Sequence, residues 1–289
     1  MTAHYTVSII VPVYEQWSMV PALLRALDSQ PTNVKTEILL VDNRSDIFRP
    51  PEQLPPNATI LVCNTPGSYA ARNFGVEQSS GEILIFTDAD CRPRPGWLRH
   101  MVEALAGMPD RLVAGDIVMI SDQEKPNAYE MYDLVRGIPQ RRYVSHGYAA
   151  TANVAVTRAL FDKLGGFDAR RKSGGDADFC RRAIKAGAKL VFEPRAVVEH
   201  PARSTWAELT TKARRVKGGQ IRHQKSRGRL LINVIRTFLP PGGAIVNFLN
   251  STNWPLSYRL VAIAIQLRLW VVEIAEVLRL LTGAEEERR

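Results

Sequence analysis

The sequence predicts an α/β fold, in which a mostly parallel central sheet is flanked by helices and followed by a basic and amphipathic helical extension. Within the first hundred residues, four short runs rich in Val, Ile and Leu alternate with segments of helical spacing. This alternation is typical of a parallel sheet whose two faces are both covered by helices. From Thr205 onward the strand-like runs give way to helical patterns. We therefore expect a globular body with a helical appendage.

The first half of the chain alternates cleanly between strand and helix patterns. In chain order, the expected elements are strand 7–13, helix 19–29, strand 37–43, strand 59–63, a loop and helix over 67–80, and strand 82–88. Each strand is a continuous apolar run of buried-strand length, and the helix over 19–29 has apolar residues at helical spacing.

The second half alternates less regularly. The expected elements are strands 112–120 and 147–157, helices 158–168 and 174–187, strand 189–194, and an amphipathic helix over 259–281. The apolar half of that last helical wheel holds Leu260, Ile263, Leu267, Val271, Ile274 and Leu278.

The excess of basic residues is confined to one end of the chain. Residues 1–200 carry 23 Lys and Arg against 23 Asp and Glu, whereas residues 201–289 carry 15 against 6. The net charge of +9 therefore belongs to the last 89 residues. We expect a catalytic domain over 1–203 and an extension over 204–289, and we expect anionic partners at the extension.

Composition indicates a folded protein of a reducing compartment. Of the 289 residues, 45% are hydrophobic and 23% are charged, which is ordinary for a globular protein. The three cysteines are widely spaced and suggest neither a disulfide framework nor a zinc site. Residues 1–14 lack the basic segment and cleavage site of a signal peptide, and no run of 18 apolar residues occurs. These features favour a cytoplasmic location.

Polar residues follow three of the predicted strands at their carboxyl ends. Residues 12–15, Asp42, and the pair Asp88 and Asp90 would all meet at one edge of a parallel sheet. Ligands of such sheets bind beyond the carboxyl ends of the strands. Alone, the pair of aspartates could also serve only to form a turn and cap the next helix. Their convergence with the other strand ends favours a binding site.

Five ordered motifs resemble those of glycosyltransferases of family two, which have the GT-A fold. They span about residues 5–200 and read SIIVPVYE, LLVDNRSD, GSYAARNFGVEQSSGEILIFTDADCRP, TANVAVTRALFDKLGGFD and GGDADFCRR. The resemblance implies an inverting transferase that takes a sugar, of the hexosyl type, from a UDP- or GDP-linked donor. It also implies a divalent metal, Mg²⁺ or Mn²⁺, which neutralises the charge of the departing diphosphate.

The resemblance assigns residues to the metal and the donor. It implies that Asp90 ligates the metal, that Asp88 contributes to the metal site and contacts the ribose or sugar, and that His200 completes the metal shell. A structural role for His200, which precedes Pro201, is an equal alternative. The implied donor contacts are Pro12, Val13, Tyr14 and Glu15 at the nucleotide lip, Asp42 at the base or ribose, Arg72 at a phosphate or the sugar, and Asp88 with Ala89. For Arg72, the alternative is a surface arginine of a helix.

Inversion by a single displacement requires one base at the acceptor hydroxyl. Asp176 occupies the position of the family's catalytic aspartate. The acid that usually precedes it is replaced by Gly175, so Asp178 on the acceptor side stays open as the base. Both acids could instead be favoured only by the dipole at the start of the helix.

Other departures from the family pattern narrow the activity. Asn43 and Arg44 stand where a second acid and a glycine are commoner. Residues 218–224 read GGQIRHQ and lack the tryptophan that follows in processive polysaccharide synthases. We therefore expect single sugar addition, in the synthesis of cell-surface polysaccharide or glycolipid.

The sequence also bears on three rival classes of protein. Another sugar-nucleotide enzyme, such as a nucleotidyltransferase, would carry a glycine-rich phosphate loop after the first strand, and VPVYEQW has no glycine. A nucleic-acid binder would interleave aromatic and basic residues, but Trp206 is the single aromatic between Arg203 and Arg229. An inactive GT-A scaffold is opposed by the retained acids. We therefore expect no nucleic-acid partner.

The extension favours an anionic membrane surface as a partner. Residues 203–229 hold nine Lys and Arg against one acid, Glu208, and an amphipathic helix follows. This composition is typical of proteins that lie on an anionic leaflet. We expect a peripheral protein on the inner face of the plasma membrane, with a lipid-linked or membrane-proximal acceptor. The alternative is that the helix packs on the body and the basic residues line the diphosphate site.

Overall fold

A computed structural model describes residues 5–30, 34–222 and 226–287, without the side chains of residues 227 and 229. Part of the predicted basic stretch, residues 223–225, lies outside the described residues. The chain divides into two compact units. Unit 1 comprises Met1–Val118, Ile138–Arg170 and Gly175–His200, and unit 2 comprises Met119–Gly137, Arg171–Gly174 and Pro201–Arg289. Each unit is a group of residues that contact one another. The domain boundary after residue 203 stays a prediction.

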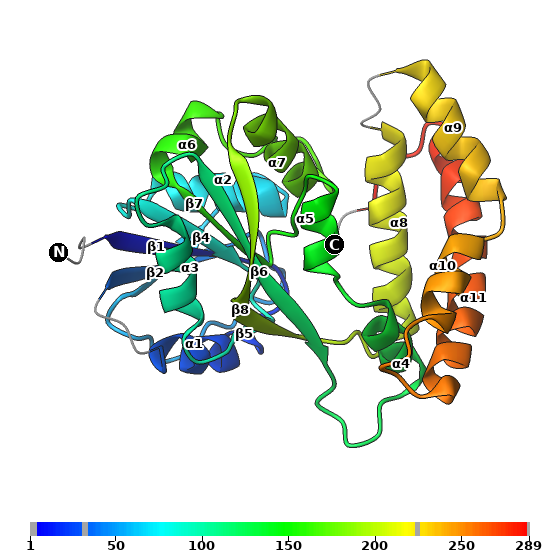
Figure 1. Cartoon of the computed structure of the whole chain (residues 1–289), viewed down its shortest axis with the longest axis horizontal. Coiled ribbons are helices and arrows are strands. Elements are labelled where there is room, and N and C mark those ends of the chain that lie inside the picture. Colours follow the sequence, from blue (N-terminus) through cyan, green and yellow to red (C-terminus); the bar gives the residue numbers. More distant parts are fainter. Residues whose placement is uncertain (1–4, 31–33, 223–225, 288–289) are drawn as a thin grey trace. The chain divides into compact units, whose positions relative to one another are not determined.

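Unit 1 is built around an eight-stranded sheet with the order β3-β2-β1-β4-β7-β6-β8-β5 (Figure 1). Its strands are β1 (Thr6–Val13), β2 (Lys35–Asp42), β3 (Ala58–Val62), β4 (Ile83–Thr87), β5 (Arg92–Pro93), β6 (Arg111–Ile120), β7 (Asn153–Thr157) and β8 (Lys189–Pro201). Strands β3, β2, β1 and β4 run parallel, whereas β7 is antiparallel to β4 and β6 is antiparallel to β7. The predicted α/β class is confirmed, with the parallel part of this mixed sheet in its first half.

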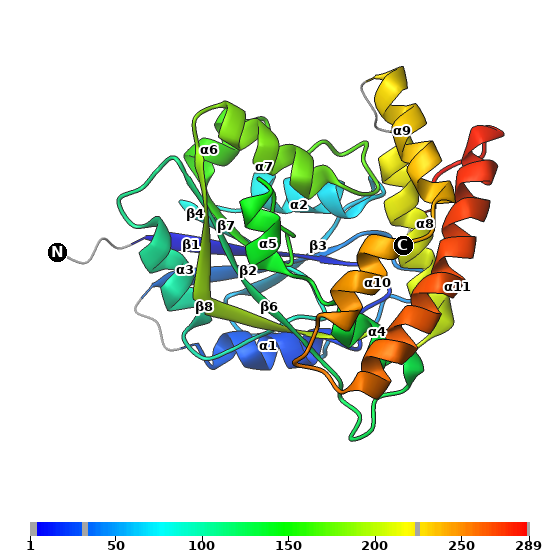
Figure 2. The ribbon, with the colours of Figure 1, turned by 45° about the vertical axis from the view of Figure 1, so that its right-hand side comes forward.

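Helices cover both faces of the sheet of unit 1, as expected for buried parallel strands (Figures 1 and 2). One face packs on α1 (Val20–Asp28) and α3 (Trp97–Leu105), and the other packs on α2 (Ser68–Glu77), α6 (Arg158–Lys163) and α7 (Gly175–Lys185). A short helix, α5 (Gln140–Ser145), precedes β7. Side chains of the apolar runs predicted as strands are buried in these two cores, where they pack against the helices.

Two strand predictions needed correction. The run 147–157 is a strand only over β7, because the side chain of Gln140 holds the preceding loop through both polar groups of Ala150, at 2.9 and 3.1 Å. The strand predicted to end at Pro194 continues to Pro201, because β5 pairs with its far end. Both differences come from contacts that are distant in sequence.

Unit 2 is built from helices that pack on one another. They are α4 (Ala128–Arg136), α8 (Trp206–Arg222), α9 (Arg227–Phe238), α10 (Gly242–Leu249) and α11 (Leu256–Leu281). The predicted C-terminal helical extension is thus present. Tyr132 of α4, Leu209 of α8 and Leu269 of α11 lie in one buried apolar cluster. Judged by length and composition, none of the single described helices could cross a membrane, whereas Leu230–Phe238 and Gly242–Leu249, joined at a bend of 62°, could do so together.

The long helix α11 has an exposed and a buried apolar side. Leu267 and Val271, which belong to the predicted apolar half, are 40% and 62% exposed. The buried side holds Ala262, Ile265, Leu269, Val277 and Leu280 together with two polar residues, Gln266 and Glu276. Gln266 accepts a hydrogen bond from the hydroxyl of Tyr132 at 3.0 Å, which satisfies its buried carbonyl. The helix therefore packs through a second apolar side, and most of the predicted apolar half is exposed.

A buried ion cluster holds α4 and α8 together. Asp133 is 1% exposed and forms ion pairs with Arg203 at 2.8 Å and with Lys212 at 3.4 Å. Burial favours the neutral acid, but the charges of Lys212 and Arg203 outweigh it and hold the pKa of Asp133 well below its ordinary value. The carboxylate therefore neutralises two cations that have little access to water.

Replacing Asp133 with asparagine should destabilise the protein strongly. The change leaves Arg203 and Lys212 buried without their counter-charge, which typically costs about 3–5 kcal/mol of unfolding free energy. Because the pKa is lower in the folded state, the contribution of Asp133 is complete above about pH 4 and declines as the pH falls below that value. Thermal unfolding followed by circular dichroism over a pH series measures both effects. Asp168→Asn, which breaks the surface pair with exposed Arg170, is the control and should cost less than about 1 kcal/mol.

Candidate active site

The carboxyl ends of β2, β1 and β4 lie next to one another at the point where the strand order reverses. Strands β1 and β2 pair in register from Thr6 with Lys35 to Val13 with Asp42. The backbone N–H of Asn43 donates to the carbonyl of Val13 at 2.8 Å, which extends this contact past the strand ends. The sheet therefore gathers the predicted nucleotide lip and Asp42 at the edge from which Asp88 emerges, where α/β sheets bind ligands.

Three potential metal ligands lie together beyond this edge. Each of Asp88, Asp90 and His200 offers a ligand atom within 4.8 Å of the others. The nearest approach between Asp90 and His200 is 3.6 Å, from Oδ1 to Nε2. His200 is 4% exposed and Asp90 is buried as well. The three residues named for the metal are thus brought together by the fold.

The pairing of two short strand segments brings His200 to the aspartates. Directly after Asp90 the chain forms β5, which runs antiparallel to the end of β8 with Arg92 opposite Glu199. The same register places His200 beside residues 90–91. The histidine is therefore positioned by backbone hydrogen bonds close to the acid with which it would share an ion.

The donor atoms in this cluster suit a hard divalent cation. Two carboxylates and one imidazole are ligands that Mg²⁺ and Mn²⁺ accept. Cys91 follows Asp90 in sequence, but its thiol lies in the apolar core, where it donates to the carbonyl of Ala152 at 3.8 Å. Burial raises the pKa of this thiol well above the ordinary value, and Asp90 and Asp88 raise it further. The thiol therefore stays protonated and adds no thiolate. Gln16 donates a hydrogen bond from Nε2 to Oδ2 of Asp90 at 2.7 Å. Its own Oε1 is buried and accepts no hydrogen bond from the described residues.

Arg72 is a buried residue of the site. It lies on α2, is 3% exposed, and forms a direct ion pair with Asp88. Its guanidinium carbon also lies 5.7 Å from the ring centroid of Tyr69, one turn earlier on the same helix. The alternative of a surface arginine is therefore wrong. The contact of Arg72 with a phosphate or sugar stays a prediction.

Tyr69 connects this arginine to the predicted base. Its hydroxyl donates a hydrogen bond to Oδ1 of Asp176 at 3.4 Å, and the backbone N–H of Ala177 donates to the same oxygen at 2.8 Å. Asp176 lies in the first turn of α7, where the helix dipole favours an anion. A continuous series of contacts therefore leads from Asp88 through Arg72 and Tyr69 to Asp176.

The glycine before Asp176 has a steric explanation. A Cβ atom at Gly175 would lie 2.7 to 2.9 Å from three carbons of the Tyr69 ring. Contacts this short essentially do not occur between a Cβ and its neighbours. The acid that is usual at this position in the family is therefore incompatible with the Tyr69 ring where it stands.

Asp178 is engaged in a structural network. Its Oδ2 accepts from Nε of Arg182 at 2.8 Å. The same guanidinium donates to the backbone carbonyls of Leu164 and Gly166, both at 2.6 Å. Asp178 thereby anchors the turn after α6 to α7. The assignment of the base to Asp176 or Asp178 stays a prediction.

Hydrogen bonds to the carboxylate of Glu15 hold the predicted nucleotide lip against residues 46 and 47. Glu15 has a positive φ of 57°, and its carboxylate accepts from the backbone N–H groups of Asp46 and Ile47. Asp42 is buried and accepts from the indole N–H of Trp17 at 2.9 Å. Among the other donor-site residues, Pro12, Val13 and Ala89 are buried and Tyr14 is half-buried. Their contacts with a donor stay predictions.

Sequence reasoning missed three residues that shape the site, namely Gln16, Trp17 and Tyr69, and it named Asn43 only as a departure from the family pattern. Asn43 donates to the carbonyl of Thr65 at 2.7 Å and accepts from the N–H of Gly67 at 2.6 Å, which fixes the start of α2. Gln16 and Trp17 directly follow the predicted lip, so proximity was the available signal. Tyr69 had none, because its partner lies 107 residues away.

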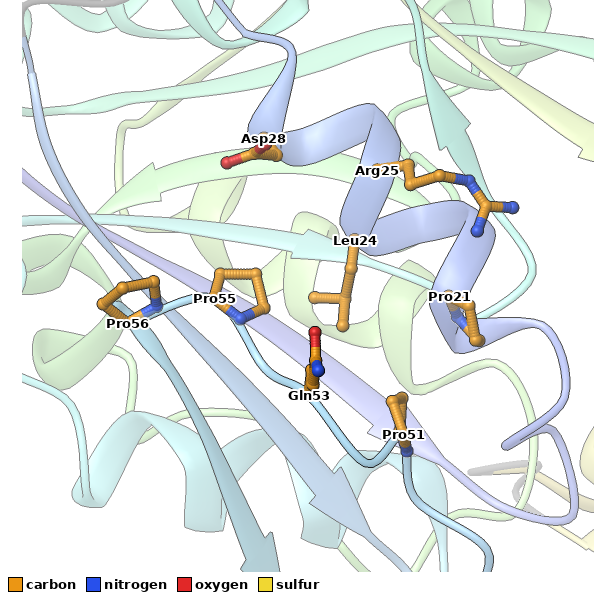
Figure 3. Close-up of a pocket in the computed structure, with 8 residues that line it drawn as sticks. All are labelled: Pro21, Leu24, Arg25, Asp28, Pro51, Gln53, Pro55 and Pro56. Atoms are coloured by element: carbon orange, nitrogen blue, oxygen red, sulfur yellow. The ribbon is translucent and has the colours of Figure 1, made fainter.

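A separate groove of about 400 Å³ lies between α1 and the loop that precedes β3 (Figure 3). Its lining includes Leu24, Arg25 and several prolines, and none of the predicted site residues is among the lining residues. The metal cluster is thus not part of this groove.

Comparison with known proteins identifies the family. The profile described as "Glycosyl transferase family 2" matches residues 8–173, which is more than half of the chain. The chain belongs to glycosyl transferase family 2. It is similar to Glycosyltransferase AglE of Haloferax volcanii, with 37% identity over 226 residues that cover 74% of this chain and 73% of the relative. The chain is therefore a glycosyltransferase, although the matched range ends before Asp176 and His200.

Solved structures of two other glycosyltransferases share the fold of this family 2 chain. One is the mannosyltransferase PcManGT from Pyrobaculum calidifontis, in complex with GDP-Man and Mn²⁺, with a TM-score of 0.58, 17% identity, and coverage of 98% of this chain and 89% of that one. The other is GalNAc-T7 with UDP, GalNAc and Mn²⁺, with a TM-score of 0.54, 19% identity, and coverage of 69% and 43%. At these identities the likeness shows the GT-A fold alone.

Replacing Asp90 with asparagine should weaken Mn²⁺ binding by about 10-fold or more, because it removes a charged oxygen ligand while nearly preserving shape. Titration of the full chain with Mn²⁺, followed by electron paramagnetic resonance of the free ion, measures the affinity. Asp162→Asn, at an exposed position on α6, is the matched control and should bind as the wild type does. Equal Mn²⁺ affinity of wild type and Asp90→Asn would show that the cluster is not a metal site.

Proposed function

We propose that this chain transfers a hexosyl group from a nucleoside diphosphate sugar, UDP- or GDP-linked, to an acceptor hydroxyl with inversion at the anomeric carbon. The observation that carries the proposal is the cluster of Asp88, Asp90 and His200 at the carboxyl edge of the sheet, within 4.8 Å of one another. Membership of family 2 supports it, because the cluster lies where such a fold binds a donor.

The donor side of the site suits a diphosphate. Asp88, Asp90 and His200 would hold Mg²⁺ or Mn²⁺, which neutralises negative charge on a departing nucleoside diphosphate. The solved relatives with GDP-Man and Mn²⁺ and with UDP and Mn²⁺ support this donor class. Arg72 adds a permanent cation beside Asp88, and burial strengthens its interaction with an anionic donor.

The acceptor side requires a single base. As the acceptor oxygen forms its bond to the anomeric carbon, the bond from that carbon to the diphosphate oxygen breaks, and Asp176 takes the hydroxyl proton. The Tyr69 hydroxyl and the N–H of Ala177 both bond to Oδ1 of Asp176, and so they fix the orientation of the carboxylate. Asp178 is already bound to Arg182. These contacts support Asp176 as the base.

The acceptor class follows from the extension. A basic unit with exposed apolar helices supports a lipid-linked or membrane-proximal acceptor, in the synthesis of glycolipid or cell-surface polysaccharide.

A donor screen tests the activity directly. Purified protein with Mn²⁺ is offered a panel of nucleotide sugars, and nucleotide release is measured with and without chelator. Nucleotide release that requires neither metal nor a particular donor would contradict the proposal. Binding of a donor without any release of nucleotide would indicate an inactive scaffold.

Replacing Asp176 with asparagine should lower transfer by about 100-fold or more, because the acceptor proton loses its base. Donor affinity, measured by calorimetry, should change little, since the base meets the acceptor. Asp178→Asn is the matched control in the same helix and should retain most of its activity. The reverse result would move the base to Asp178. Nuclear magnetic resonance of the product should show the anomer opposite to that of the donor, and retention would contradict a single displacement.

A further inference from the structure

Helix α9 exposes a continuous apolar stripe. This α9 stripe comprises Leu231, Ile232, Ile235 and Phe238 on the helix and Leu239 directly after it, and all are exposed. Their spacing places them on one side of the helix. The other side holds Leu230 and Val234, which pack on the buried residues Ile221, Val277 and Leu280. The helix thus has a complete core contact, and the stripe lies outside it.

Helix α11 exposes a second stripe along its whole length. The members of this α11 stripe are Leu256, Leu260, Leu267, Val271, Leu278 and Leu281, all at least 40% exposed. They recur at helical spacing, while α11 packs on α4, α8, α9 and α10 through another face. Exposed apolar patches of this extent mark interaction surfaces in proteins.

The charge of this region decides between possible occupants. Residues 201–289 carry a net charge of +9. Arg222, at the end of α8, and Arg236, on α9, are both exposed. A second copy of this chain would bring the same positive charge, which opposes association of the two surfaces. A bilayer with anionic headgroups supplies both the apolar phase for the stripes and the opposite charge for the arginines.

We propose that the α9 and α11 stripes dock on the surface of an anionic lipid bilayer. The bend of 62° between Leu230–Phe238 and Gly242–Leu249 lies at Pro240 and Pro241, and Phe238 and Leu239 are the exposed apolar residues next to it. Docking takes these side chains out of water while the arginines stay at the headgroups. The proposal stands on unit 2 alone and does not depend on the sugar-transfer chemistry.

The test is cosedimentation of the full chain with vesicles of phosphatidylcholine, with and without phosphatidylglycerol, at low and high salt. The wild type should partition onto the anionic vesicles, and less so onto neutral vesicles or at high salt. Two double variants remove the stripes, Ile235→Glu with Phe238→Glu on α9 and Leu267→Glu with Val271→Glu on α11. Each should weaken partitioning by about 10-fold or more. Arg222→Gln with Arg236→Gln should remove mainly the preference for anionic lipid.

The matched control is Met108→Glu with Ile184→Glu, which places the same charges at exposed apolar positions of unit 1 and should leave partitioning unchanged. Thermal unfolding checks that each variant is folded. The vesicles contain no sugar acceptor, so failure of the proposed transfer reaction does not affect the result. Negligible partitioning on both vesicle types, or full partitioning of both stripe variants, would overturn the proposal. So would a lipid-free dimer in light scattering that the stripe variants dissociate without any vesicle binding.

Discussion

Two carboxylates that leave a buried strand one residue apart repel each other, and the surrounding structure is arranged to stabilise them. Asp88 is paired with the buried guanidinium of Arg72, and Asp90 receives a hydrogen bond from Gln16 and lies against His200. Each of these partners comes from a different element, so the ends of β1, β4, α2 and β8 must meet at one place. These contacts offset the repulsion between the two acids and so hold both carboxylates at one place.

The parallel half of the fold could be predicted because each of its strands is a continuous apolar run. The ends of those runs predicted residues 12–15, Asp42, Asp88 and Asp90, whereas the other site residues followed from the family resemblance. The pairing of β5 with β8 could not be predicted, since β5 has two residues and no pattern of its own. The same limit explains why His200 had two equal interpretations. The burial of Arg72 could not be predicted either. Arg72 follows two alanines on α2, and the sequence does not show which side of this helix faces Asp88 and Asp90.

Unit 2 shows how an amphipathic pattern can be correct and still leave the packing undecided. The predicted apolar half of the α11 helical wheel is largely exposed, whereas Ile265, Leu269 and the polar Gln266 lie on its buried side. Gln266 can be buried because Tyr132 supplies its hydrogen bond, and Glu276 can be buried because Arg279 pairs with it at 2.7 Å. Which side of a helix is packed therefore depends on partners that single-sequence periodicity does not contain.

The close approach of Gly175 to the Tyr69 ring links the residues that can occupy two distant positions. Any side chain at position 175 competes for the volume of the aromatic ring at position 69. A family member with the usual acid before its catalytic aspartate should therefore carry a smaller or differently placed residue where this chain has Tyr69. The pair of residues at these two positions would then divide family 2 into lineages that orient the same aspartate in two ways, by a neighbouring acid or by a tyrosine hydroxyl.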